Sequence, residues 1–239
     1  MKTKSVFIIF LTVFTVFASC NISGIKGNGN VVKQKRKISN KFTEINVRHG
    51  INLYLSQGSN ISVISEADEN IQEFLITEVK NGVLNIYFSE TTGNVKAKNV
   101  YVTMPEINKI TASSAADVKL KTPVKSERLE IAASSGADID AKTDVAELVC
   151  VSGSGADVEI KGICKTANLK SSSGADIDAE DLNAEIVTAK TSSGGDITIS
   201  VSKEIFAEAS SGGDITFYGN PKKTEVKTSS GGDIKQRNK

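Results

Sequence analysis

The chain has 239 residues, with 29 Lys and Arg against 28 Asp and Glu, no Trp and 5% aromatic residues. This near-neutral balance does not suggest a nucleic-acid partner, which would require a basic patch. The length allows one or two domains. So few aromatic side chains are unusual for a compact globule of this size, but they suit a coil of short strands.

Residues 1–19 have the layout of a secretory signal peptide. A basic start precedes an apolar run of 12 residues, 6–17, which is too short for a bilayer because spanning needs roughly 20. Small residues then lead to Cys20, and the junction resembles a bacterial lipobox, with Phe17 where Leu is usual. We therefore expect an exported outer-membrane lipoprotein, on the periplasmic or the cell-surface face, anchored by lipid on Cys20. An ordinary signal peptide with an incidental cysteine is the alternative.

Residues 20–30 are expected to form a short tether for the lipid anchor, and residues 31–110 a β-rich region. Alternating apolar residues indicate strands across this region. Asn81-Gly82 lies between two apolar runs and predicts a tight hairpin turn. No obvious linker follows, so we expect the region to pack on residues 111–239 as irregular early coils.

Two further features stand out in residues 31–110. One short helix is expected over residues 68–75, with Asp68 near its N-terminus. His49 is the single histidine and precedes Gly50 at what resembles a corner between two strands. Because the sequence supports no Ser-His-Asp or Cys-His arrangement around it, we expect a structural or surface role.

Residues 111–239 contain one motif seven times, which reads Ser-Ser-Gly-Gly-Asp-Ile in its most regular form. Its aspartates are Asp117, Asp138, Asp157, Asp176, Asp196, Asp214 and Asp233. Successive aspartates are 21, 19, 19, 20, 18 and 19 residues apart. Such spacing is typical of a repeat architecture.

Apolar and polar residues alternate on both sides of the motif, which predicts two half-buried strands per repeat. A single repeat cannot bury its apolar face alone, whereas a stack of seven forms a continuous core. We therefore predict an all-β fold: a parallel β-helix, or solenoid, of seven coils of about 19 residues, preceded by a less regular β-rich N-terminal half. It is expected to be right-handed, because right-handed crossovers dominate parallel sheets. A sandwich of repeated antiparallel hairpins is the alternative.

Stacking would place the seven aspartates in one row, with neighbours about 4.8 Å apart. Calcium binding along this row is one hypothesis, since Ca²⁺ takes 6–8 oxygen ligands. The other interpretation is that each aspartate accepts backbone hydrogen bonds and closes its own corner. No other cofactor is expected.

Cys150 and Cys164 lie seven residues before and seven after Asp157. In an exported protein they could form a disulfide, provided that their Cα atoms approach within about 7 Å. Two buried free thiols are the alternative. The spacing and the lack of a nearby histidine argue against zinc.

Four lysines are expected on one outward face of the repeats: Lys119, Lys121, Lys142 and Lys161. They are expected to solvate that face or to pair with Asp140 and Glu159, and contact with an acidic glycan is a further hypothesis. Because the acids recur once per coil, as scaffold residues do, we expect no catalytic residues and no enzymatic activity. A carbohydrate-active β-helix enzyme, which needs a unique cluster of acids, is the alternative.

Several segments together resemble the putative auto-transporter adhesin, head GIN domain family, which is common among exported proteins of Bacteroidetes. They are residues 27–32, 42–45, 49–53 and 82–86, followed by the Ser-Gly-Asp repeats. The resemblance covers roughly residues 27–235 and implies a β-helical fold and an exported location, with no catalytic residues to carry over.

We therefore expect a membrane-anchored binding or structural module, an adhesin head that contacts a glycan, a protein or another copy of itself. A periplasmic envelope-maintenance lipoprotein without adhesion is the remaining alternative. The last coil leaves an edge guarded by Lys235, Arg237 and Lys239, and any self-association is expected there.

Overall fold

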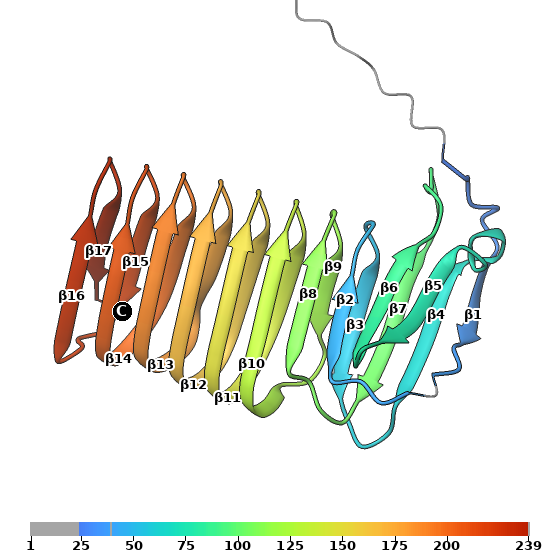
Figure 1. Ribbon diagram of the computed structural model, residues 1–239, viewed down its shortest axis with the longest axis horizontal. Coiled ribbons are helices and arrows are strands. Elements are labelled where there is room, and N and C mark those ends of the chain that lie inside the picture. Colours follow the sequence, from blue (N-terminus) through green and yellow to red (C-terminus); the bar gives the residue numbers. More distant parts are fainter. Residues whose placement is uncertain (1–23, 39, 239) are drawn as a thin grey trace, which may run out of the picture.

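The structure is a computed structural model that describes residues 24–38 and 40–238. These residues form an elongated stack of β-coils with one short 3-10 helix, η1 (Glu69–Ile71) (Figure 1). The predicted all-β class, the solenoid of about seven turns and the less regular N-terminal region are confirmed. No helix in the described residues is long and apolar enough to cross a membrane.

The strands fall into an N-terminal group and a repeat group. The N-terminal group is β1 (Val31–Lys35), β2 (Glu44–Val47), β3 (Asn52–Gln57), β4 (Ser62–Asp68), β5 (Leu75–Lys80), β6 (Val83–Phe88) and β7 (Lys98–Met104). The repeat group is β8 (Lys109–Ser113), β9 (Asp117–Leu120), β10 (Val124–Ser134), β11 (Asp138–Gly153), β12 (Asp157–Ser172), β13 (Asp176–Ser192), β14 (Asp196–Ala209), β15 (Asp214–Tyr218), β16 (Lys223–Thr228) and β17 (Asp233–Arg237).

Each regular coil has two strand segments that face each other across one core. The long strands β11 to β14 bend part-way, so that their first parts pair in one sheet and their second parts in another. Neighbouring coils are parallel and in register, for example Ile139 with Val158 and Cys150 with Leu169. We call the sheet of the first parts, which also contains β1, β4, β7, β3, β9, β15 and β17, the ladder sheet. The opposite sheet contains the second parts with β5, β6, β2, β8, β10 and β16.

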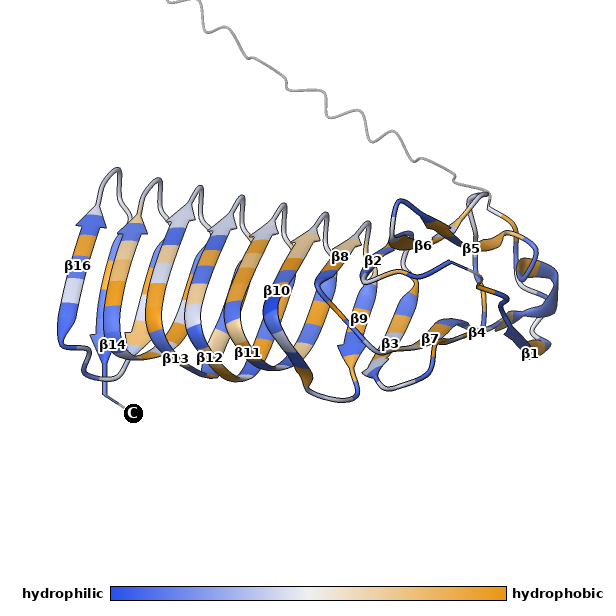
Figure 2. Cartoon of the chain, turned by 60° about the horizontal axis from the view of Figure 1, so that its bottom comes forward, coloured by the Kyte–Doolittle hydropathy of each residue, from blue (hydrophilic) through white to orange (hydrophobic). Residues whose placement is uncertain are grey.

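The alternating sequence pattern places the core between these sheets. In β12, Val158 and Ile160 point inward and are buried, whereas Asp157 and Glu159 are exposed. Figure 2 shows this alternation as orange and blue bands along the strands. Because each coil adds an inward row from both sheets, one apolar core runs from Phe42 to Phe217.

The first coils are stacked out of chain order. Strand β2 lies between β6 and β8, and β3 lies between β7 and β9, all in parallel. The coil made of β2 and β3 is therefore inserted between one that follows it in the sequence and the start of the repeats. Antiparallel pairing is found at the N-terminal end, where β4 joins β7, β1 joins β4, and β5 joins β6. The β5–β6 turn is the predicted one, with positive φ at both Asn81 and Gly82.

The N-terminal end of the tube is closed by the crossing from β4 to β5. Ile71 in η1 and Leu75 at the start of β5 are buried there. The expected helix over residues 68–75 is wrong in type and length, since η1 has three residues. Asp68 caps no helix: its buried carboxylate accepts backbone hydrogen bonds from Gly29 (2.6 Å), Lys96 (2.8 Å) and Ala97 (3.1 Å).

The described part of the expected tether is bound to this same end. The amide of Ile25 donates to the carbonyl of Thr91, and that of Gly27 donates to the carbonyl of Asn94, both at 2.9 Å. Residues 25–30 therefore belong to the folded body. Cys20 and the predicted signal peptide lie outside the described residues.

Candidate binding surface

The sharp corner between the two sheets is a two-residue turn repeated in every coil. In the second repeat, Ser135 (φ 57°) and Gly136 (φ 66°) are both left-handed, which is the geometry of a type I′ turn. Such turns carry a backbone bond between their first and fourth residues, as from Gly195 N to Ser192 O at 3.1 Å. The corner is therefore closed by its own backbone. A backbone hydrogen bond to a ladder carboxylate is seen between coils, where the amide of Asp214 donates to Asp196 Oδ1 at 3.1 Å.

Successive corners are also bonded to one another. The amide of Gly136 donates to the carbonyl of Ser154 in the next coil (3.2 Å), and that of Asp138 donates to Ala116 in the preceding coil (2.9 Å). The same two bonds recur along the stack. Small residues are needed here because the backbones approach closely: a Cβ on Gly195 would lie 2.7 Å from the amide of Ser172.

These corners place the predicted aspartates in one ladder. Asp117, Asp138, Asp157, Asp176, Asp196, Asp214 and Asp233 are consecutive in-register partners on the ladder sheet. All seven side chains are exposed on its outer face. The sequence spacing therefore predicted both the register and the face.

The ladder continues past its first aspartate with two asparagines that the sequence analysis did not single out. Asn52 is in register with Asp117 and with Asn99, and its Nδ2 donates to Asn99 Oδ1 at 2.9 Å. The corner before Asn52 is His49-Gly50, with φ values of 65° and 61°. This confirms the expected corner at His49. The signal that could have revealed its place in the stack is the match of His-Gly-Ile-Asn to Ser-Gly-Ala-Asp.

Partial burial, together with like charges along the ladder, raises the pKa of two of its members. For Asp138, partial burial comes first, followed by the charges of Asp157 and Asp117. For Asp176, burial is again followed by the charges of Asp196 and Asp157. At the far end the trend reverses, because a hydrogen bond from Lys235 lowers the pKa of Asp233.

A second acidic row runs beside the ladder: Asp140, Glu159 and Asp178 are in-register partners one coil apart. A shallow hollow of about 350 Å³ lies among these residues and Asp117, Asp138, Asp157 and Asp176. The acids therefore recur coil by coil.

Three of the four lysines predicted for this face have partners on it, and Lys142 is exposed. Lys119 pairs with Asp140 at 3.4 Å, and Lys161 pairs with Glu159 at 2.5 Å. The ammonium of Lys121 lies 4.6 Å from the centre of the Tyr54 ring. The expected pairing with Asp140 and Glu159 is thus seen directly.

Metal ligation by the ladder is not apparent from its geometry. In the part of the chain that the structure describes, no group of three or more His, Cys, Asp or Glu side chains is arranged to hold a metal ion. The aspartates follow the solenoid axis in single file instead of converging on a point. Calcium binding by Asp117 to Asp233 stays a prediction.

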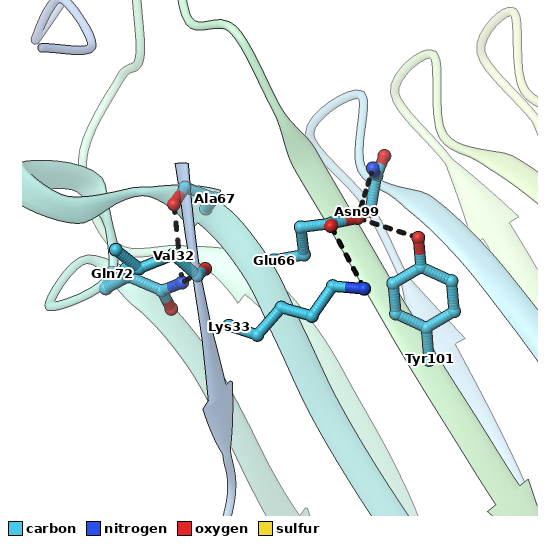
Figure 3. Close-up of polar contacts among 7 residues, drawn as sticks. All are labelled: Val32, Lys33, Glu66, Ala67, Gln72, Asn99 and Tyr101. Carbon is cyan, nitrogen blue, oxygen red and sulfur yellow. Dashed lines mark hydrogen bonds and ion pairs between the residues drawn. The ribbon is translucent and has the colours of Figure 1, made fainter. Parts of the chain in front are cut away.

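A polar cluster borders the ladder at its N-terminal end (Figure 3). Glu66 accepts hydrogen bonds from Asn99 (3.0 Å) and Tyr101 (2.7 Å) and pairs with Lys33 at 3.2 Å. The bonds from Asn99 and Tyr101 lower the pKa of Glu66, and the bond to Glu66 raises the pKa of Tyr101 to about 12. The Tyr101 ring stacks on Tyr54 with centroids 5.0 Å apart.

Two buried hydroxyls brace the corners from inside and were missed because their positions are mostly apolar in other repeats. Ser152 donates to the carbonyl of Ala156 at 2.8 Å, and Ser171 donates to that of Ala175. Both serines are fully buried. A serine can occupy this inward, buried position because the corner carbonyl accepts a hydrogen bond from its hydroxyl.

A groove of about 630 Å³ lies at the bends of β11 to β14, on the side of the solenoid opposite the corners. We call it the edge groove; its apolar lining includes Val145, Ile163, Cys164, Ala184, Val201 and Tyr218. It lies where the pairing of β13 with β14 slips in register between Ala179 and Asn183. The sequence signal for this irregularity was the unequal spacing of 20 and then 18 residues between aspartates.

The cysteines left open as a disulfide are free thiols in the structure. Cys150 is in register with Leu169 in the opposite sheet, whereas Cys164 is in register with Val145. The two inward residues thus belong to different rows of the core. Burial raises the pKa of both thiols, that of Cys164 to about 12.

Residues 41–221 match the family model described as "Putative auto-transporter adhesin, head GIN domain". The chain belongs to this family. The predicted resemblance is therefore confirmed, and the match includes the β2–β3 coil and six of the seven aspartate corners of this GIN domain. A comparison with curated proteins gives no match.

Solved structures show the same fold. A putative adhesin from Bacteroides fragilis superposes with a TM-score of 0.84 at 24% identity, covering 90% of this chain and all of the other. A putative lipid binding protein from Parabacteroides distasonis has a TM-score of 0.73 at 20% identity, covering 88% and 99%. A putative adhesin from Parabacteroides merdae also reaches 0.73, at 18% identity, covering 89% and 98%. The family favours an exported or surface protein.

Proposed function

We propose that this GIN domain is an exported adhesin head, held at a membrane by lipid on Cys20, that contacts a glycan or a protein through the outer face of the ladder sheet. The observation that carries the proposal is the in-register repetition of that face. Identical groups recur along it at the strand spacing of about 4.8 Å, which suits an extended ligand that is touched at many weak points.

Binding without catalysis fits the chemistry of the same face. A glycoside hydrolase needs two acids with different roles at a defined separation. Here the carboxylates of Asp138, Asp157 and Asp176 repeat the same environment in successive coils. His49, whose Nδ1 lies 3.0 Å from the carbonyl of Phe88, serves a corner.

A glycan array and a panel of surface proteins, probed with the chain from residue 20 onward, would test the contact. The test variant is Asp138→Asn, Asp157→Asn, Asp176→Asn. Its matched control is Glu147→Gln, Glu208→Gln, Glu225→Gln, which removes three charges from the opposite sheet. Ligand signal that falls with the first variant alone supports the proposal; equal binding by both would place the contact elsewhere.

Anchoring is tested separately. The lipid on Cys20 should appear in the mass of the membrane-extracted protein and vanish in Cys20→Ala. Protease treatment of intact cells would then separate a surface-facing adhesin from a periplasmic envelope lipoprotein.

A further inference from the structure

Positive charge is concentrated at the N-terminal end of the molecule. Residues 24–43 contain six Lys and Arg and no Asp or Glu, whereas residues 109–238 contain sixteen Lys and Arg against twenty Asp and Glu. Strand β1 forms that end, beyond β4 (Figure 1). Residues 24–108 together contain ten Lys and Arg against eight Asp and Glu, so the N-terminal part has a small net positive charge and the repeats have a net negative one.

Most of these cations are not used by the fold. Lys33 pairs with Glu66, and the half-buried Arg36 donates to Ser65 and Gln72. The other four are Lys26, Lys35, Lys37 and Lys41. Each is exposed, and none of them forms an ion pair with any described residue. Their charge is available to a partner.

Apolar side chains lie beside the lysines. Lys35 and Lys37 border a hollow of about 710 Å³ that Ile38, Ile61 and Val63 also line. Ile61 is 39% exposed, one of the few large apolar side chains left on the surface. Lysines beside exposed aliphatic groups are the combination by which peripheral segments bind the boundary between headgroups and acyl chains.

The chain itself brings this end to a membrane if Cys20 is lipidated. Gly24, which packs against the backbone of Thr92 and Gly93, is four residues after Cys20 in the sequence. Four residues span at most about 14 Å. That reach is comparable to the Debye length of about 8–10 Å, over which surface charges act.

We propose that the N-terminal end, through Lys35 and Lys37 at and just after the end of β1, is a contact surface for the anionic phospholipid headgroups of the membrane that holds the anchor. The inference rests on the proposed anchoring at Cys20. Lys26 and Lys41 add to the attraction, and Ile61 enters the headgroup layer. The net negative repeats are repelled by the same surface, so that the solenoid stands away from the bilayer and presents the ladder sheet.

Sedimentation with vesicles tests this surface without the lipid anchor. The protein is the chain from residue 20 onward with Cys20→Ala, which retains every described residue. It should bind vesicles of phosphatidylcholine mixed with phosphatidylglycerol, fail to bind phosphatidylcholine alone, and be released by high salt. Lys35→Ala with Lys37→Ala should lower the partition coefficient about 30-fold, because each basic residue near an anionic surface contributes about 1 kcal/mol.

The matched control is Lys142→Ala with Lys170→Ala, which removes two exposed lysines from the repeats. Equal binding to both kinds of vesicle, or an equal loss with the control pair, overturns the inference. Lipid on Cys20 of the cellular protein together with no preference for anionic vesicles overturns it as well, while leaving the anchoring intact. Anionic binding by a protein that carries no lipid in cells would refute the anchor and keep the surface.

Discussion

Asn52 donates a hydrogen bond to Asn99 at 2.9 Å on the row where Asp117 and Asp138 follow in register. The ladder therefore stacks two kinds of polar side chain, with opposite energetic consequences. Amides in a row satisfy one another as donor and acceptor, whereas carboxylates in a row repel. The asparagines lie between Glu66, which is in register with Asn99 and paired with Lys33, and the seven aspartates.

Replacing an inner aspartate by asparagine should stabilise the protein. For Asp138→Asn we expect a gain of about 1 kcal/mol at neutral pH, because two neighbouring charges about 4.8 Å away no longer repel it. In a chain of this size that is about 2–4 °C in Tm. Asp233→Asn is the control: its carboxylate is paired with Lys235 at 2.6 Å, so this substitution should give no gain. Calorimetry of the two variants decides; equal shifts would contradict a repulsive ladder.

Partial burial and the same repulsion, which together raise the pKa of Asp138, should make the gain depend on pH. The folded pKa of Asp138 is raised, so its contribution to stability is complete below the ordinary pKa of 3.8 and is lost as the pH rises through the folded pKa. The difference in Tm between Asp138→Asn and the native chain should therefore be largest at neutral pH and shrink towards pH 3.8. A difference that stays constant over this window would mean that charge is not its cause.

Gly162 should be irreplaceable. Its φ is 123°, and a Cβ there would lie 2.0 Å from the carbonyl oxygen of Thr143 in the preceding coil. Gly162→Ala should cost about 2–3 kcal/mol, through backbone strain and a displaced coil. Gly153→Ala provides the comparison, since its Cβ would find no atom closer than 3.7 Å. Urea unfolding of both variants should separate them, and similar midpoints would show that the bend is more adaptable than this contact implies.

The two inner thiols should be inert in the native protein and free once it unfolds. Cys150 and Cys164 are buried, and their raised pKa values leave almost no thiolate at pH 8. Alkylation without reductant should add no mass to them in buffer and one label to each in denaturant. Failure to label in denaturant would reveal a disulfide.

The C-terminal edge should be held apart by its charges. Strands β16 and β17 each pair on one side with the coil before them, and Val226 is 50% exposed. Lys235→Ile with Arg237→Ile should promote association, because charged side chains on an edge strand discourage pairing. Light scattering against Lys142→Ile with Lys170→Ile would show whether the effect belongs to the edge. An unchanged particle size for both would remove this edge as a route to self-association.

The fold of the repeats was predictable because each repeat has the same local sequence pattern. Each repeat has a small corner residue, an exposed aspartate such as Asp138 or Asp157, and alternating apolar neighbours such as Ile139. Because these recur at nearly constant spacing, the repeat length and the inward or outward position of each residue together determine the register. The N-terminal region lacks such repetition. The insertion of β2 between β6 and β8, and of β3 between β7 and β9, depends on contacts between segments far apart in the sequence, for which a single sequence offers no signal.

Local rules also failed where a tertiary contact outweighed them. Asp68 matched the pattern of a helix N-cap, but three backbone amides from two other segments draw its carboxylate into the interior. Burial acts to raise its pKa, and those hydrogen bonds outweigh it, so the pKa is lowered. In the repeats, Ser152 followed an apolar register as a polar residue because the carbonyl of Ala156 receives its hydroxyl.

The order of the coils sets where this architecture can change length. From β10 onward each coil pairs with its immediate predecessor and successor in the chain, so one unit can be duplicated or lost while the flanking units simply meet each other. The coil of β2 and β3 instead lies between strands that follow it in the sequence, β6 on one side and β8 and β9 on the other. An extra coil inserted on either side of it would separate these strands from their partners. Natural variants of the fold should therefore differ in the number of distal units and share one invariant base.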